Sequence, residues 1–159
     1  MKFNHLVEIN DPLNPLIEPL TRDQVWRGLM LRASSPKLFV PWLDACNLVQ
    51  RSVDAIDREL RYGDVVICDH VTFVAQQQVQ YHVPAQQDIP PSHLDMTIEE
   101  PQPGLLFVRF SYQDASADAA GTTEAFYNEF RRSAYQESDI DTIRIIRELA
   151  ADGRLDQPD

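Results

Sequence analysis

The spacing of hydrophobic residues changes from one region of this chain to the next, and this change limits the folds that it can adopt. Between residues 46 and 113, apolar side chains recur at every second position, which is typical of strands with one buried face. Because the connections between these strands are short, we expect an antiparallel meander. Six strands are predicted, at residues 46–53, 57–62, 64–75, 78–83, 92–99 and 105–113.

A strand and two helices are expected before this meander. Residues 3–9 alternate between apolar and polar side chains and predict a first strand. Thr21 and Gln24 then form a capping box at the start of a helix with one apolar stripe. A Ser-Ser-Pro segment at residues 34–36 ends that helix, and we expect a short second helix that ends near Pro41.

The last regular element is a long helix. A linker of small residues, 114–121, leads into residues 123–150, which contain no proline and no interior glycine. The fold class that follows is α+β, with a seven-stranded antiparallel sheet curved around the C-terminal helix that covers its apolar face. The side of this helix expected to face the sheet consists of Phe126, Tyr127, Phe130, Ala134, Ile140, Ile143 and Ile146.

Length and composition indicate a single globular domain. The chain has 159 residues, against a usual domain size of roughly 100–200 residues. We assign residues 1–152 to one domain and residues 153–159 to a short C-terminal tail. The two cysteines, Cys46 and Cys68, are too few for a disulfide framework.

The charge balance and the absence of long apolar runs exclude several classes of partner. Fourteen Lys and Arg against 25 Asp and Glu give a net charge of −11, which repels phosphate backbones and anionic lipid surfaces. No nucleic-acid partner is therefore expected. Because the chain shows neither a signal peptide nor an apolar run of the ~18 residues that span a bilayer, we expect a cytoplasmic protein without membrane insertion.

Strand alternation identifies the side chains that point toward the long helix. Most are apolar, but four polar groups from the strands and Glu137 from the helix share that face. Ionisable groups seldom stay buried without a partner or a water-filled space, so they indicate a cavity rather than a solid core. Each polar group also has a structural alternative, as a core side chain with a satisfied hydrogen bond. The predicted ligand-binding residues are His5, Asp69, Phe73, Tyr81, Met96, Phe110, Tyr112, Phe130, Ala134 and Glu137.

No catalytic or metal-binding motif is present in the sequence. The chain lacks a nucleophile elbow, a phosphate-binding glycine loop and a His-Glu-x-x-His segment. His70, His82 and His93 fall on neighbouring strands, but alternation places them on the solvated face, where three surface histidines are the simpler interpretation. We therefore predict no metal, no cofactor and no specific catalytic residue.

Three segments give the chain a family resemblance. They are LTRDQVWRGL at residues 20–29, DHVTF at 69–73 and SAYQESDIDTIR at 133–144. Together with the order of elements they resemble the AtaL-like subfamily of the START-like (SRPBCC, helix-grip) superfamily. The resemblance implies a curved sheet that grips a C-terminal helix around a ligand cavity, in a superfamily that includes lipid carriers, hormone receptors and polyketide cyclases.

Three functions remain open from the sequence. The first is binding of a small apolar molecule, such as a lipid, a polyketide-like compound or an aromatic compound, by a monomer or homodimer. The second is a cyclase, dehydratase or hydrolase acting in the same cavity, with His5 or Glu137 as general acid or base. The third is an interaction or regulatory domain with a solid core.

Overall fold

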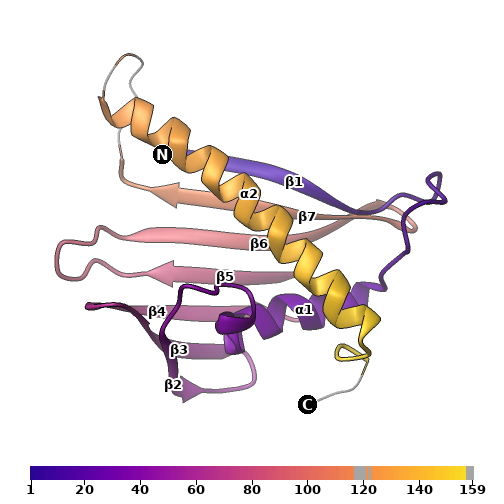
Figure 1. Ribbon diagram of the computed structural model, residues 1–159, viewed down its shortest axis with the longest axis horizontal. Helices are drawn as coiled ribbons and strands as arrows, with labels where there is room; N and C mark the ends of the chain where they lie inside the picture. The colour runs from indigo at the N-terminus through magenta and orange to yellow at the C-terminus, as the bar shows by residue number, and fades with distance from the viewer. Residues whose placement is uncertain (117–120, 122, 157–159) are drawn as a thin grey trace.

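The computed structural model describes residues 1–116, 121 and 123–156, which form one sheet and two α-helices (Figure 1). Residues 117–120 of the predicted linker and the last three residues of the predicted tail lie outside this range. The elements in chain order are β1 (Lys2–Asn10), α1 (Arg22–Ser34), a 3-10 turn η1 (Pro36–Leu38), β2 (Ala45–Arg51), β3 (Ala55–Tyr62), β4 (Val65–Val74), β5 (Gln78–Val83), β6 (Ser92–Gln102), β7 (Leu105–Asp114) and α2 (Thr123–Ala151).

The seven strands form one antiparallel sheet in the order β1-β7-β6-β5-β4-β3-β2, which confirms the predicted meander. The chain leaves β1 at one edge, passes through α1 and re-enters at the opposite edge as β2. The register follows the predicted alternation, since Val71 pairs with Tyr81, and Tyr81 with Leu94. Val65 occupies an inward-facing position of this alternation but is 46% exposed, because it lies beside the turn that joins β3 to β4.

The start of α1 forms as its sequence predicts. The Gln24 backbone N–H donates to the Thr21 hydroxyl at 3.0 Å, and the Thr21 N–H donates to the Gln24 side chain at 2.9 Å. The predicted short second helix is a single 3-10 turn over Pro36–Leu38. The N–H groups of Phe39 and Val40 both bond to the Pro36 carbonyl, and the chain turns away toward β2.

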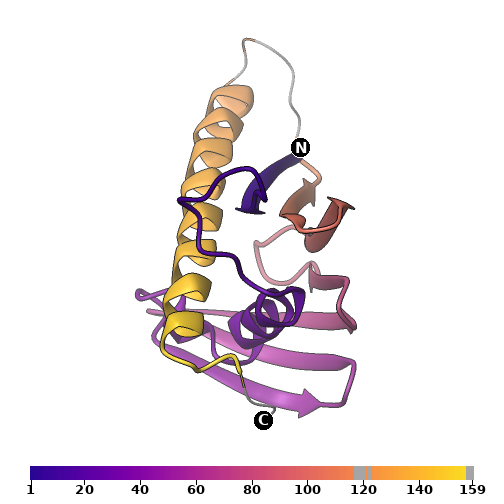
Figure 2. The same cartoon turned by 90° about the vertical axis from the view of Figure 1, so that its right-hand side faces the viewer.

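The core lies where α1 is enclosed between the sheet and the C-terminal half of α2 (Figure 2). Gly28 of α1 allows the close approach of the two helices, since a Cβ atom built on it would meet three side-chain atoms of Ile146 at 2.7–2.9 Å. Leu155, which lies in the predicted tail, is buried in this core. The largest fully buried apolar side chains are Phe110, Ile9, Leu29, Ile56, Met96 and Ile146.

Helix α2 crosses the concave face of the sheet diagonally, from the β1–β7 edge to α1 (Figure 1). Ile143 and Ile146 are buried as predicted, but the prediction for the N-terminal half of the helix is wrong. Phe126, Phe130 and Ile140 are 81%, 69% and 57% exposed, and Tyr127, Ala134 and Glu137 are exposed as well. The buried face of the whole helix instead consists of Asn128, Asp139, Thr142, Ile143, Ile146 and Leu149. No helix in the described part of the chain is long and apolar enough to cross a membrane.

Candidate functional site

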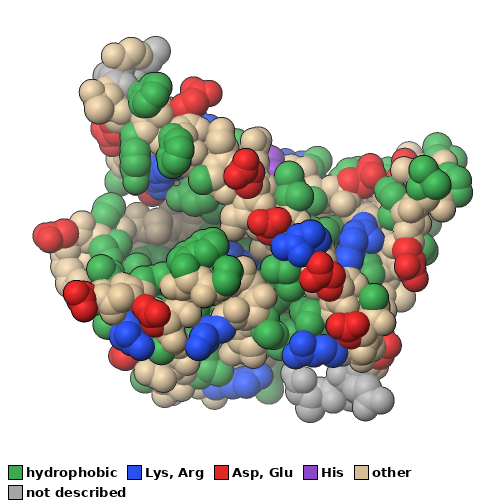
Figure 3. All heavy atoms as spheres, in the orientation of Figure 1, with side chains coloured by type: hydrophobic (Ala, Val, Ile, Leu, Met, Phe, Trp, Pro, Cys, Tyr) green, Lys and Arg blue, Asp and Glu red, His purple; other side chains and the backbone are tan. Residues whose placement is uncertain are grey.

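A cavity of about 330 Å³ lies between the concave face of the sheet, the end of α1 and the N-terminal half of α2. Figure 3 shows the hollow between that half of α2 and the strands beneath it. Its walls combine apolar side chains with an unusual number of polar ones. The lining residues are Arg32, Arg58, Leu60, Tyr62, Ile67, Asp69, Tyr81, Val83, Ser92, His93, Leu94, Tyr112, Gln113, Asp114 and Tyr135.

A buried ion pair forms one wall of this cavity. The Arg58 guanidinium donates to both carboxylate oxygens of Asp69, at 2.8 and 2.6 Å, and to the Ala33 carbonyl at 2.9 Å. The two side chains are 5% and 4% exposed. Burial alone would lower the pKa of Arg58, but the bond to Asp69 outweighs it and raises that pKa above its usual value. Asp69 therefore points inward as predicted, and its charge is matched by Arg58.

A second arginine, Arg32 of α1, faces the same cavity without a carboxylate of its own. Its Nε donates to the Thr142 hydroxyl at 3.4 Å. Burial would lower the pKa of Arg32, but Tyr81, Tyr112 and Asp139 outweigh it and raise that pKa, so the guanidinium stays charged. Within the described residues, no Asp or Glu oxygen lies within 4.0 Å of Arg32.

Tyr81 lies between the two arginines. Its ring centroid is 5.5 Å from the guanidinium carbon of Arg32 and 5.1 Å from that of Arg58. Its hydroxyl oxygen is buried and forms no hydrogen bond of ordinary geometry with a described residue, although it lies close enough to the Arg32 guanidinium to help raise the pKa of that group. An unsatisfied buried hydroxyl costs roughly 1–3 kcal/mol, so a ligand atom or water that bonds to it would be stabilised there.

A chain of hydrogen bonds connects the cavity to the interior. The Tyr112 hydroxyl donates to the Asp139 carboxylate, 2.8 and 2.7 Å from its two oxygens, and His5 Nε2 lies 2.7 Å from Asp139 Oδ2. Asp139 is fully buried, and burial raises its pKa, although Tyr112, His5 and Arg32 act in the opposite direction. Burial, followed by the neighbouring Asp139, raises the pKa of Tyr112, which keeps its hydroxyl as a donor. This arrangement can hold a proton next to a bound ligand.

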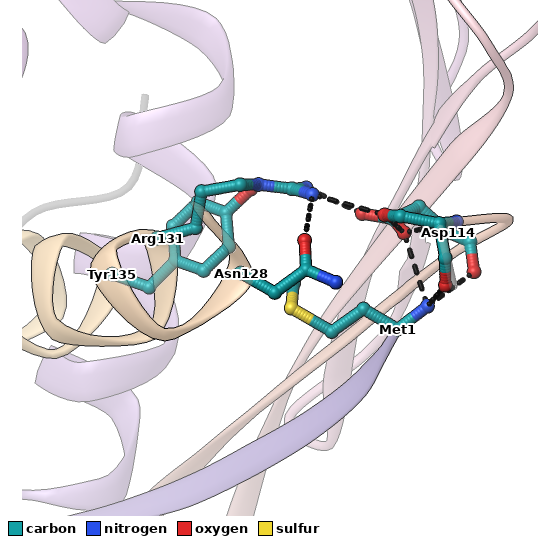
Figure 4. Close-up of polar contacts among 6 residues, drawn as sticks. Met1, Asp114, Asn128, Arg131 and Tyr135 are labelled. Atoms are coloured by element: carbon teal, nitrogen blue, oxygen red, sulfur yellow. Dashed lines mark hydrogen bonds and ion pairs between the residues drawn. The ribbon is translucent and has the colours of Figure 1, made fainter. Parts of the chain in front are cut away.

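The mouth of the cavity is closed on one side by Tyr135 of α2. Its ring stacks on the Tyr112 ring with centroids 4.0 Å apart and an interplanar angle of 5°. Arg131 donates to the Tyr135 hydroxyl at 3.0 Å and also pairs with Asp114 at the end of β7 (Figure 4). The Met1 amino group donates to the same Asp114 carboxylate at 3.1 Å. A polar network therefore fastens the N-terminal half of α2 to the sheet.

Asp114 is the centre of that network. Burial would raise its pKa, but hydrogen bonds from Ser116, Arg131 and the Met1 amino group outweigh burial and lower it far below the usual range. The lowered pKa favours the ionised carboxylate, which holds Arg131 in place beside Tyr135.

A second, larger cavity of about 700 Å³ lies at the other end of the domain, between α1, the β2–β3 turn and the residues after α2. It contains Trp26 and Phe73, whose rings meet edge to face with centroids 6.3 Å apart. Its rim includes Val53, which is 99% exposed. No buried side-chain N or O atom without a partner is found in its described lining, and we therefore take the smaller cavity as the candidate site.

The predicted ligand-binding residues fall into four groups. Asp69, Tyr81 and Tyr112 line the candidate cavity, and His5 reaches it through Asp139. Met96 and Phe110 are fully buried in the core, and Phe73 lines the second cavity. Phe130, Ala134 and Glu137 point away from the sheet, because the opposite face of α2 is turned inward.

Sequence reasoning missed several residues of the site. Arg58 shares its strand face with Ile56 and Leu60, so alternation along β3 could have identified it. Arg32 lies three residues after Leu29 on the buried stripe of α1, and helical spacing could have identified it. No sequence signal distinguished Asp139 from Glu137 as the inward acid.

The strand positions of the three histidines follow the predicted alternation, but His93 also contributes to the lining of the candidate cavity and His82 is half-buried. The rings of His82 and His93 stack with centroids 4.4 Å apart, and His70 bonds to Asp57 through Nδ1. Among the described residues, no group of three or more His, Cys, Asp or Glu side chains is placed to hold a metal ion.

Comparison with known proteins identifies the family. Residues 7–153 match the model of the family described as acetylaranotin biosynthesis cluster protein L, AtaL. The chain belongs to the AtaL family. No curated protein matches this AtaL-family chain significantly.

Solved structures share the helix-grip fold of this AtaL-family protein at low sequence identity. The di-domain ARO/CYC StfQ from the steffimycin biosynthetic pathway has a TM-score of 0.68 and 10% identity, covering 95% of this chain and 51% of that chain. The Zhui aromatase/cyclase from Streptomyces sp. R1128 has a TM-score of 0.59 and 12% identity, covering 92% and 90%. Human STARD10 has a TM-score of 0.63 and 9% identity, covering 94% and 64%. The AtaL-family chain spans about half of the two di-domain structures that it matches, 51% of StfQ and 49% of BexL from the BE-7585A pathway.

Proposed function

We propose that this protein binds a small molecule with an aromatic or polyketide-like body in the cavity between the sheet and α2. The observation that carries the proposal is the buried Tyr81 hydroxyl, which has no hydrogen-bond partner in the described part of the chain although it lies in the wall of a cavity. A ligand in the cavity that forms a hydrogen bond with this hydroxyl would stabilise it. The volume of about 330 Å³ is at the lower end of the range for small-molecule sites, which favours a compact ligand.

Two further observations support the proposal. The apolar side chains Leu60, Ile67 and Leu94 line the cavity together with the stacked rings of Tyr112 and Tyr135, and they offer contacts to a flat apolar body. The family model takes its name from a biosynthesis cluster, and two of the structural neighbours are described as aromatase/cyclases. Both facts favour a polyketide-like or aromatic ligand over a long lipid chain.

Native mass spectrometry of freshly purified protein tests this function. A bound molecule should appear as added mass that disappears on denaturation. Leu94→Trp, which places an indole inside the cavity, should abolish the added mass. Val53→Trp, at a fully exposed turn outside the cavity, is the matched control and should retain it. Added mass that survives in Leu94→Trp would place the ligand elsewhere.

A second candidate function, acid–base catalysis in the same cavity, is favoured by the chain Tyr112–Asp139–His5. A buried carboxyl with a raised pKa, bonded to the hydroxyl of a tyrosine that lines the cavity, is the kind of pair that can move a proton in acid–base catalysis. The compound released from the protein should be incubated with wild type and with Tyr112→Phe, and its conversion followed by mass spectrometry. Conversion by wild type and not by a Tyr112→Phe protein that still binds the compound would establish catalysis. An unchanged compound would favour a carrier.

A further inference from the structure

We propose that the ligand carries a carboxylate, and that Arg32 and Tyr81 bind this carboxylate. The inference rests on the proposed binding function and specifies the chemistry of the ligand. It follows from the contacts of the charged groups around the cavity, in which Arg32 forms no direct ion pair with a described residue.

The two arginines of the cavity are in different situations. Arg58 has a carboxylate partner, since Asp69 accepts two of its hydrogen bonds within 2.8 Å. Arg32 donates its Nε to the neutral Thr142 hydroxyl at 3.4 Å, and no ion pair to it is found among residues 1–116, 121 and 123–156. The N–H groups of its two terminal nitrogens have no acceptor of opposite charge.

The acids near the cavity are already engaged. Asp69 is paired with Arg58, Asp114 accepts from Arg131, and Asp139 accepts from Tyr112 and lies at hydrogen-bond distance from His5. Asp139 lies near enough to Arg32 for the two groups to shift each other's pKa, but its oxygens are bonded to Tyr112 and His5 and it forms no direct ion pair with Arg32. The guanidinium of Arg32 can therefore donate to the carboxylate of a bound molecule.

Tyr81 provides a second donor beside the guanidinium. Its hydroxyl is buried without a partner in the described chain, and its ring lies 5.5 Å from the guanidinium carbon of Arg32. A planar carboxylate has two oxygens, so one can accept from the guanidinium and the other from the phenol. A neutral amide of the same shape offers only one such oxygen and no charge.

The binding of two matched compounds tests the inference. 2-Naphthoate and 2-naphthamide have the same ring system and nearly the same shape, and they differ in the charge of the head. We expect wild type to bind 2-naphthoate roughly 10- to 100-fold more tightly in isothermal titration calorimetry, the range for hydrogen bonds to a charged group. Arg32→Met should abolish this preference by weakening naphthoate binding while leaving naphthamide binding unchanged.

The controls separate the inference from the proposed function. Arg27→Met removes an arginine from the same helix that pairs with Asp23 and does not line the cavity, so the preference should persist. Equal binding of both compounds by wild type would overturn the carboxylate inference and leave the proposed function intact. If neither compound bound, both would be contradicted. Because the wild-type comparison needs no variant, the test stands even if Arg32→Met fails to fold.

Discussion

Removing one partner of the buried pair between Arg58 and Asp69 should destabilise the domain severely, whereas removing both should not. Each side chain is about 5% exposed or less, so Arg58→Met leaves a carboxylate with no countercharge in the cavity wall. Breaking a buried pair in this way costs about 3–5 kcal/mol of unfolding free energy. The cavity admits water beside the pair, so we expect a value near the lower limit, about 3 kcal/mol.

The double variant Arg58→Met/Asp69→Leu provides the decisive comparison. With both charges replaced by apolar side chains, the desolvation cost of the ions disappears together with their attraction, and similar exchanges are often neutral. The Ala33 carbonyl loses its bond from Arg58, which costs roughly 1 kcal/mol. We therefore expect the unfolding free energy of the double variant to be about 1–2 kcal/mol lower than that of wild type and higher than that of Arg58→Met.

Urea denaturation followed by circular dichroism measures these differences. In a domain of this size, each kcal/mol lost from the unfolding free energy lowers the melting temperature by roughly 2–4 °C. Arg58→Met should therefore also melt about 6–12 °C below wild type. A double variant that loses the sum of the two single losses would refute the reasoning. So would an Arg58→Met protein within about 0.5 kcal/mol of wild type, the usual range for exposed sites.

Three further variants test other parts of the structure. Gly28→Ala should destabilise the domain by roughly 1–2 kcal/mol in urea, because overpacking against Ile146 outweighs the gain in helix propensity, and Gly28→Ala/Ile146→Val should recover part of the loss. The pKa of Asp139 is raised, so just above pH 3.8 the folded state holds a proton that the unfolded state has lost. The unfolding free energy of wild type should therefore fall as pH rises in this range. Urea titrations at several pH values should show this fall for wild type and not for Asp139→Asn. The pKa of Asp114 is lowered, so its contribution to the unfolding free energy is complete above pH 3.8 and is lost as pH falls below that value. At neutral pH the unfolding free energy of Asp114→Asn should be roughly 1.5–3 kcal/mol lower than that of wild type. This difference in unfolding free energy should narrow in acid.

The sheet could be predicted from the sequence because its residues obey one rule throughout. In β4 to β7 most apolar side chains face the core and most polar ones face solvent, with the buried Asp69 as an exception, so the alternation of Val71 and Tyr81 with His70 and His82 predicted the register. The capping box at Thr21 was equally informative, since its bonds are local.

Helix α2 could not be oriented from its sequence, because the rule that apolar residues face inward is reversed in its N-terminal half. There the inward face lines a polar cavity, while Phe126 and Phe130 are exposed. Glu137 and Asp139 are about 200° apart around a helix, so choosing the wrong face selected the wrong acid. Arg32 was overlooked for a related reason, since the stripe of α1 was identified from its apolar residues alone.

The division of α2 into two halves separates the part of the helix that packs in the hydrophobic core from the part that borders the candidate cavity. Ile143, Ile146 and Leu149 hold the C-terminal half to the core, and the cavity residues of the other half contribute little to that packing. Side chains such as Tyr135 can therefore be exchanged without loss of the hydrophobic core. Residues around the cavity can therefore change while the packed end of the helix stays constant, and the same fold is found in the Zhui aromatase/cyclase and in human STARD10 at 12% and 9% identity to this chain.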